Sequence, residues 1–237
     1  MHSETEAVWQ ESSLGDCIEL KRGYDLPKRL RKPGNVPILT SSGHNGWHDT
    51  AKVKAPGVVT GRYGTIGKVF FVEEDYWPLN TSLYVRDFKG SDPRFVSYFL
   101  KTIRWEQYTD KAAVPGVNRN HVHMERVRWP PLPEQRRIAA VLGALDDKIE
   151  LNRKMNRTLE AMAQALFKSW FIDFDGHDHL VDSELGPIPK GWEVVELQDL
   201  VGLDKGLSYK SKNFDPDGTP MVNLKCIARG GGFQHSG

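Results

Sequence analysis

Six long cationic side chains stand close together near the start of this 237-residue sequence. Between positions 21 and 32 only Asp25 opposes them in charge. They are Lys21, Arg22, Lys28, Arg29, Arg31 and Lys32. Contact with nucleic-acid phosphates requires long cationic side chains along one surface, and this segment can supply them. The alternative is an ordinary solvated loop, and the residue types alone do not separate the two.

Several turns carry the polar residue types that read base edges. Arginine can bond guanine through two hydrogen bonds, and asparagine can bond adenine in the same way. Gly61 and Gly64 flank Arg62-Tyr63 and predict a tight hairpin that holds Arg62 rigidly near DNA. Taken singly, each candidate fits an ordinary turn role better than a reading role. The candidate readers are Ser41, Ser42, His44, Asn45, Arg62, Tyr63, Thr81, Ser82, Asn118, Arg119 and Asn120.

Patterns that would indicate catalysis are weak. The stretch after Gly61 superficially resembles a phosphate-binding loop, but five residues rather than four separate Gly61 from Gly67. Val69 also lacks the hydroxyl that such a loop uses to bind its metal. His121 and His123 are two apart without a second ligand pair, so ordinary surface or core roles fit them better than metal binding. We therefore expect a protein that is not an enzyme and that binds no metal or cofactor itself.

The composition predicts a globular protein, with 39% hydrophobic and 27% charged residues. The formal net charge is +1, but residues 1–132 carry 19 Lys and Arg against 15 Asp and Glu. This basic excess is a hint of an anionic partner. Cys17 and Cys226 form no disulfide or metal pattern, which suits a reducing compartment. Without an apolar leader or an 18-residue apolar run, we expect a cytoplasmic location.

The pattern of residues 1–132 predicts a mixed α+β domain with many short strands. Short apolar runs bounded by turn residues predict strands at 36–39, 57–60, 68–72 and 82–85, and a last strand at 127–131. Helical spacing predicts a local helix from Phe95 to about Tyr108, started by Asp92 and Pro93. These elements would position the cationic segment and the candidate readers.

A heptad rhythm predicts one long helix from Pro133 to about Phe171. A lone exposed helix could not bury its apolar seam, so we expect a partner helix. The seam positions are Ile138, Leu142, Leu145, Ile149, Asn152, Asn156, Leu159, Ala163, Leu166 and Trp170. The two Asn near the midpoint favour an antiparallel pairing with a defined register, and the alternative is a solvated break in a surface helix.

The sequence after the long helix repeats its own beginning at an offset of 183. Seven identities fall in the aligned stretch, and they include a Trp, a Gly and two Pro that shape the backbone. The repeated residues are Trp9, Leu14, Asp16, Leu20, Gly23, Pro33 and Pro37. The repeat unit is therefore a domain followed by a long helix. We expect residues 192–237 to hold only the opening of a second domain, without a core of its own.

Several motifs stand in a defined order along the chain. They are Trp9 to Gly23, Gly61 to Gly67, Pro131-Leu-Pro-Glu-Gln-Arg-Arg-Ile138, the Leu151 to Glu160 stretch, and Gly186-Pro-Ile-Pro-Lys-Gly-Trp192. This order resembles the specificity subunit of type I restriction–modification systems. The specific part is the Pro-Leu-Pro-Glu-Gln element that runs into the helix before a second domain start. In that family two target-recognition domains alternate with two long helices, which pack as an antiparallel coiled coil and dock the modification subunits.

The resemblance implies a target-recognition domain at 1–132, a spacer helix at 133–175, and the start of a second recognition domain at 176–237. It also implies sequence-specific binding of double-stranded DNA, with methylation and cleavage performed by modification and restriction subunits. S-adenosylmethionine, ATP and Mg would then be bound by those partners. Because only one long helix is present, we expect a homodimer through it, or pairing with another chain that supplies the missing half.

Two alternatives from other classes stay open. The chain could be an assembly protein that uses the helix without specific DNA readout. It could also be a fragment of a fused methyltransferase–specificity enzyme. Salt-dependent DNA binding with a sequence preference would distinguish a specificity subunit from an assembly protein.

Overall fold

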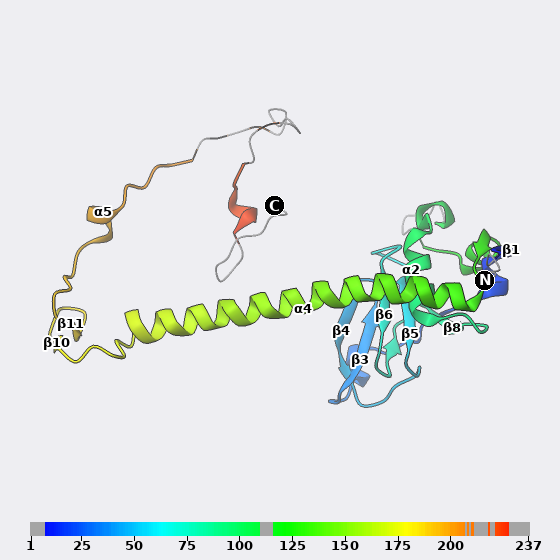
Figure 1. Cartoon of the computed structure of the whole chain (residues 1–237), viewed down its shortest axis with the longest axis horizontal. Coiled ribbons are helices and arrows are strands. Elements are labelled where there is room, and N and C mark those ends of the chain that lie inside the picture. The colour runs from blue at the N-terminus through cyan, green and yellow to red at the C-terminus, as the bar shows by residue number, and fades with distance from the viewer. Residues whose placement is uncertain are drawn as a thin grey trace, which may run out of the picture. The chain divides into compact units, whose positions relative to one another are not determined.

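The computed structural model describes residues 8–109, 116–206 and 221–227, together with positions 208, 210 and 218. The chain divides into two units, Met1–Ala161 and Met162–Gly237, and each is described by itself. Figure 1 labels their elements. No helix within the described ranges combines the length and the apolar content that crossing a membrane requires.

The first unit is an α+β domain followed by most of one long helix, so the predicted fold class is confirmed. Its strands are β1 (Gln10–Ser13), β2 (Glu19–Arg22), β3 (Val36–Thr40), β4 (Gly43–His48), β5 (Gly57–Gly61), β6 (Val69–Val72), β7 (Trp77–Pro78), β8 (Ser82–Asp87) and β9 (Arg126–Trp129). Its helices are α1 (Leu14–Cys17), α2 (Pro93–Thr102) and α3 (Arg119–His123), with 3₁₀ turns η1 (Lys28–Leu30) and η2 (Trp105–Tyr108). The long helix, α4 (Leu132–Phe171), continues into the second unit.

The strands of the first unit pair in three small sheets. Their orders are β2-β8-β5-β6, β4-β3-β7 and β1-β9. The β1–β9 pair is antiparallel and sets Gln10 opposite Trp129, so the start of the domain is paired with the strand that leads into α4. The main core lies between the four-stranded sheet and the helices, and its fully buried side chains include Leu14, Ile18, Val96 and Leu100.

The predicted helix from Phe95 to Tyr108 is interrupted. Asp92 caps α2 by accepting a hydrogen bond from the Phe95 N–H at 2.9 Å, as the sequence predicts. The helix then ends at Thr102, and the Trp105 indole donates to the Leu100 carbonyl at 2.9 Å. The last carbonyls of a helix have no main-chain partner within the helix. The Trp105 indole supplies a hydrogen bond to one of them.

The start of α4 is fixed to the domain by Gln135, whose side chain is only 3% exposed. Its Oε1 accepts from the Asp92 N–H at 2.8 Å, and its Nε2 donates to the Pro130 carbonyl at 2.9 Å. Ala139 and Gly143 continue the same buried stripe along α4. These two hydrogen bonds explain what the Gln of the Pro-Leu-Pro-Glu-Gln element does.

Helix α2 packs beside the beginning of α4, as Figure 1 shows. The Arg94 guanidinium bonds the Asp147 carboxylate, and the Tyr98 hydroxyl donates to Asp146 at 2.8 Å. A Cβ added to Gly143 would lie 2.9 Å from the Arg94 guanidinium carbon. The missing side chain of Gly143 therefore leaves room for the Arg94 guanidinium. Glycine within a helix lowers stability by about 1 kcal/mol relative to alanine, and the contact with Arg94 offsets this loss.

We predict that Gln135→Ala lowers the free energy of unfolding by about 2–4 kcal/mol, since it leaves a buried N–H and a buried carbonyl without partners. The midpoint of urea denaturation, followed by circular dichroism, measures the loss. Gln164→Ala is the matched control, because Gln164 is an exposed glutamine on the same helix. Equal midpoints for the two variants would show that Gln135 does not hold the junction.

The second unit contains a short antiparallel hairpin of β10 (Leu180–Val181) and β11 (Ile188–Pro189), followed by α5 (Leu197–Leu200) and the 3₁₀ turn η4 (Leu224–Cys226). The Trp192 ring stacks on Phe171 at 6.1 Å and meets Phe174 edge-on at 5.5 Å. Among the described residues after Phe171, only Pro189 and Cys226 are buried. The expectation that residues 192–237 lack an independent core stays a prediction.

Candidate nucleic-acid interface

Cations from separate parts of the sequence meet around one hollow of about 380 Å³ in the first unit. We call it the recognition hollow. Its apolar lining comes from the buried Leu83 and Val117. Its polar lining consists of Lys21, Arg22, Arg62, Asn118, Arg119 and Asn120. None of the described residues that line it carries a carboxylate, so the positive potential of four cations is not cancelled locally, and the hollow favours an anionic ligand.

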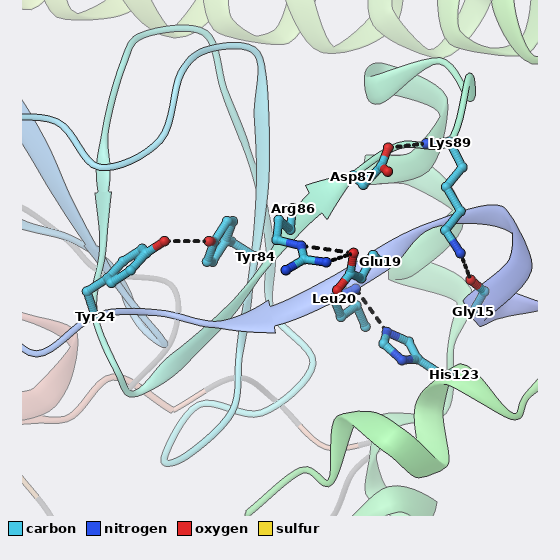
Figure 2. A network of polar contacts seen from close by, with 9 residues as sticks. All are labelled: Gly15, Glu19, Leu20, Tyr24, Tyr84, Arg86, Asp87, Lys89 and His123. Atoms are coloured by element: carbon cyan, nitrogen blue, oxygen red, sulfur yellow. Dashed lines mark hydrogen bonds and ion pairs between the residues drawn. The ribbon is translucent and has the colours of Figure 1, made fainter.

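Strand β2 brings two of these cations to the recognition hollow from the edge of the four-stranded sheet. Leu20 is fully buried, whereas Arg22 is exposed and pairs with Leu83 across the strands. The carboxylate on the same strand, that of Glu19, is bonded by Arg86 of β8, with Nε 2.9 Å from Oε2. Figure 2 shows this ion pair. The edge strand therefore presents Lys21 and Arg22 while its acidic group is already occupied.

The hairpin between β5 and β6 holds Arg62, as the sequence predicts. The Thr81 carbonyl accepts from the Arg62 N–H at 2.9 Å and from the Tyr63 N–H at 3.1 Å. A Cβ on Gly61 would overlap the Thr65 carbonyl oxygen, and Gly64 has a φ of +74°, so both glycines are required by the turn. The Arg62 guanidinium lies 4.3 Å from the centroid of the Tyr63 ring. This stacking and the fixed backbone limit the side chain to few orientations.

Helix α3 supplies the remaining polar groups. The Asn118 side chain accepts from the Asn120 N–H at 3.0 Å and so defines where the helix begins. The Val117 N–H donates to the Arg62 carbonyl at 3.0 Å, which joins this segment to the β5–β6 hairpin. At the other end of α3, the His123 Nε2 accepts from the Leu20 N–H at 2.9 Å, as drawn in Figure 2. The sequence alone offered no signal for this role of His123.

The predicted cationic stretch is divided by the structure. Lys21 and Arg22 line the recognition hollow, whereas Lys28 and Arg29 are exposed on η1. The remaining two cations already have local partners. Arg31 donates to the Asn45 carbonyl at 2.8 Å and to its side-chain oxygen at 3.0 Å, and the Lys32 ammonium lies 3.9 Å from an Asp49 oxygen.

Four further candidate readers, Ser41, Ser42, His44 and Asn45, lie in or beside the β3–β4 hairpin. Ser42 is within 3.0 Å of the Thr40 hydroxyl, and the His44 ring lies 4.6 Å from the Trp47 ring. Ser41 is buried and borders the Gly61 turn, which brings this hairpin close to the Arg62 hairpin. Contact of these residues with DNA stays a prediction.

Ser82 is not placed to read a base. Its side chain is fully buried, and its hydroxyl donates to the Leu79 carbonyl at 2.7 Å. Its neighbour Thr81 acts through its main-chain carbonyl, which holds the Arg62 hairpin. Both residues therefore support the structure of the site through hydrogen bonds to or from the main chain. The sequence pattern could not distinguish that supporting role from direct contact with a base.

The heptad seam of α4 is largely uncovered in this single chain. Ile138 packs against the domain core, so the exposed seam begins at Leu142. The exposed fractions of its large apolar members lie between 36% and 59%. They are Leu142, Leu145, Ile149, Leu159, Leu166 and Trp170, with Asn152 and Asn156 exposed between them.

Comparison with known proteins identifies relatives of this chain. The family model described as "Type I restriction modification DNA specificity domain" matches residues 6–161. The Type I restriction enzyme MjaIX specificity subunit of Methanocaldococcus jannaschii is 31% identical over 166 residues, which cover 65% of this chain and 38% of that protein. The Type I restriction enzyme HindI specificity subunit of Haemophilus influenzae is 48% identical over 61 residues, 26% of this chain and 13% of that protein.

A solved structure shares the fold. The crystal structure of a type I restriction–modification S subunit from M. genitalium matches with a TM-score of 0.56 and 18% sequence identity. The match covers 77% of this chain and 54% of that one, and at this identity it shows the fold alone. The chain spans 38% and 32% of the first two curated relatives that it matches.

Proposed function

This chain belongs to the family of type I restriction–modification specificity subunits, and we propose that it recognises one half of a split target in double-stranded DNA. The main support for this proposal is the set of cations and asparagines that line the recognition hollow. Lys21, Arg22 and Arg119 would hold phosphates, which sets position on the duplex. Arg62 and the neighbouring Asn side chains would read base edges, which sets sequence preference.

The chemistry would belong to partner subunits. The relatives are named specificity subunits of type I restriction enzymes, which supports a division of labour in which this chain selects the site. Modification subunits would then bind S-adenosylmethionine and transfer the methyl group, and restriction subunits would use ATP and Mg to cleave. This chain would bind none of these cofactors and would not be an enzyme.

The exposed seam supports pairing through α4. Two copies aligned antiparallel would cover each other's apolar side chains and place a recognition domain at each end, and a two-fold dimer reads a two-fold symmetric target. Asn152 and Asn156 lie near the helix midpoint and can meet their symmetry mates. A different chain that supplies the missing helix would instead give an asymmetric target.

The test of this function is selection of duplexes from a randomised library by the purified full chain. We expect enrichment of a defined motif, and affinity that falls steeply as salt increases. In a host that carries the chain with a modification subunit, methylome sequencing should reveal the same motif. Enrichment of no motif, together with self-association through α4, would favour the assembly protein, which the exposed seam also fits.

We predict that Arg62→Ala weakens binding to the selected duplex by about 1–3 kcal/mol and relaxes preference at one base pair. Fluorescence anisotropy against the selected duplex and its single-base variants measures both effects. Arg128→Ala is the control, because Arg128 is an exposed arginine on β9 and does not line the recognition hollow. An unaltered base preference in the Arg62 variant would remove this residue from the readout.

A further inference from the structure

Both polar walls of the recognition hollow are joined by one side chain. His123 ends α3, the helix that begins with Arg119 and Asn120. Its Nε2 accepts from the Leu20 N–H at 2.9 Å, and Leu20 directly precedes Lys21 and Arg22 on β2. Figure 2 shows the imidazole pointing from α3 to the β2 backbone. One hydrogen bond between residues 103 positions apart therefore connects the strand wall to the helix wall.

This hydrogen bond requires a neutral imidazole. A main-chain N–H can only donate, so Nε2 must hold a lone pair and the ring proton must be on Nδ1. An imidazolium carries N–H groups at both positions and has no acceptor to offer. Protonation of His123 would therefore set two N–H groups against each other and remove the contact with Leu20.

The surroundings of His123 favour its neutral form. Burial lowers the pKa of His123 below the ordinary histidine range, the charges of Arg119 and Lys89 lower it further, and Glu19 acts in the opposite direction. The Glu19 carboxylate is paired with Arg86, which weakens that opposition. Helix α1 packs against His123 through Gly15, since a Cβ added to Gly15 would lie only 2.9 Å from the His123 Cβ. Gly15 has no side chain and so brings no charge to the imidazole.

We propose that His123 is the positioning residue of the recognition hollow, and that selective DNA binding is lost when it is protonated. This inference rests on the proposed function. A protonated His123 would break the hydrogen bond that holds the end of α3 to β2, and it would add a cation beside Arg119. Asn118 and Asn120 would then no longer be held at a fixed distance from Lys21 and Arg22, so their alignment with base edges would be lost while the cations would still attract phosphates.

The expected sign differs from the usual effect of acid on DNA binding. Protonation of histidines generally adds positive charge and strengthens sequence-independent phosphate contact. For this chain, affinity for unselected DNA should hold or rise on acidification while affinity for the selected duplex falls. The informative quantity is therefore the ratio of the two dissociation constants, because a general charge effect cancels in it.

The experiment uses the full chain, a duplex enriched from a randomised library at about pH 7.5, and a scrambled duplex of equal composition. The selectivity ratio is measured by anisotropy from about pH 7.5 down to about pH 4.5, because burial lowers the pKa of His123 and its titration therefore falls below the range of an ordinary histidine. For the natural chain we expect the ratio to fall about tenfold or more. In His123→Gln the amide oxygen can accept from Leu20 and cannot titrate, so the ratio should be flat and high.

Two further variants separate the contact from its neighbours. His123→Phe removes the acceptor, so its ratio should be low at every pH. His121→Gln removes an exposed histidine of the same helix and should retain the pH profile of the natural chain. If His123→Phe fails to fold, as judged by circular dichroism, the comparison of His123→Gln with the natural chain decides alone.

A selectivity ratio that stays constant in the natural chain would overturn the inference and leave the proposed function intact. Loss of the pH profile in His121→Gln would overturn it as well, since the titrating group would then be the wrong histidine. Failure of the library to yield any enriched duplex at about pH 7.5 would instead refute the proposed function, and the inference would fall with it.

Discussion

Replacing Lys21, Arg22 and Arg119 together by alanine is expected to weaken binding of mixed-sequence duplex DNA by about a hundredfold at physiological salt. Each cation that neutralises a phosphate releases condensed counterions, so removing three should reduce the slope of log affinity against log salt by about 3. The three side chains line the recognition hollow, and none is buried, so the fold should be retained. Anisotropy titrations at several salt concentrations measure both quantities.

The matched control changes the same charge elsewhere in the domain. Lys101, Arg104 and Arg128 are exposed cations outside the recognition hollow, and their joint replacement by alanine removes three charges as well. We expect this control to change the salt slope much less. Equal slopes for the two triple variants would show that binding follows overall charge and that the recognition hollow is not the contact site.

Replacing Leu145 and Ile149 by aspartate is expected to abolish self-association of the chain. The two side chains are 59% and 47% exposed in the single chain, so the substitutions should not disturb the domain. In a two-fold dimer they would place four carboxylates in an apolar seam, where each unpaired charge costs several kcal/mol. We expect the dimer to weaken by about a thousandfold or more, as measured by sedimentation equilibrium or light scattering.

Ala144→Asp with Ala161→Asp controls for the added charge, since both are exposed alanines of α4 outside the seam. This control should dimerise as the natural chain does. A natural chain that is monomeric at about 10 µM, or a methylated motif without two-fold symmetry, would reject the homodimer and point to a different partner chain.

Local patterns were sufficient for much of the fold. Turn residues and apolar runs predicted strands β3, β5, β6 and β8, the glycines predicted the β5–β6 hairpin, and the heptads predicted α4 within one residue of its observed start. These features depend on neighbours within a few residues, and such preferences are visible in the amino-acid types.

Long-range contacts between a side chain and the main chain were not predictable. The Gln135 contact with Asp92 spans 43 positions and the His123 contact with Leu20 spans 103, and neither leaves a periodic signal. The candidate reading residues were named from their types, but only the folded sheet shows that Arg62 meets Asn118 and that Ser82 is buried. The composition of a site can thus be inferred from sequence before its geometry can.

Strand β6 has a consequence for how the protein behaves when it is heated or concentrated. It lies at the edge of the four-stranded sheet, and its sequence, Val-Phe-Phe-Val, has the apolar, proline-free character of aggregating segments. Charged residues stand at both ends: Lys68, whose ammonium lies 5.2 Å from the Phe70 ring centroid, and Glu73 with Glu74. Such flanking charges oppose pairing of this edge strand with the same strand of a second molecule. Because salt screens exposed charges, high-salt buffers should lower the temperature at which the protein precipitates, and low-salt storage should protect it.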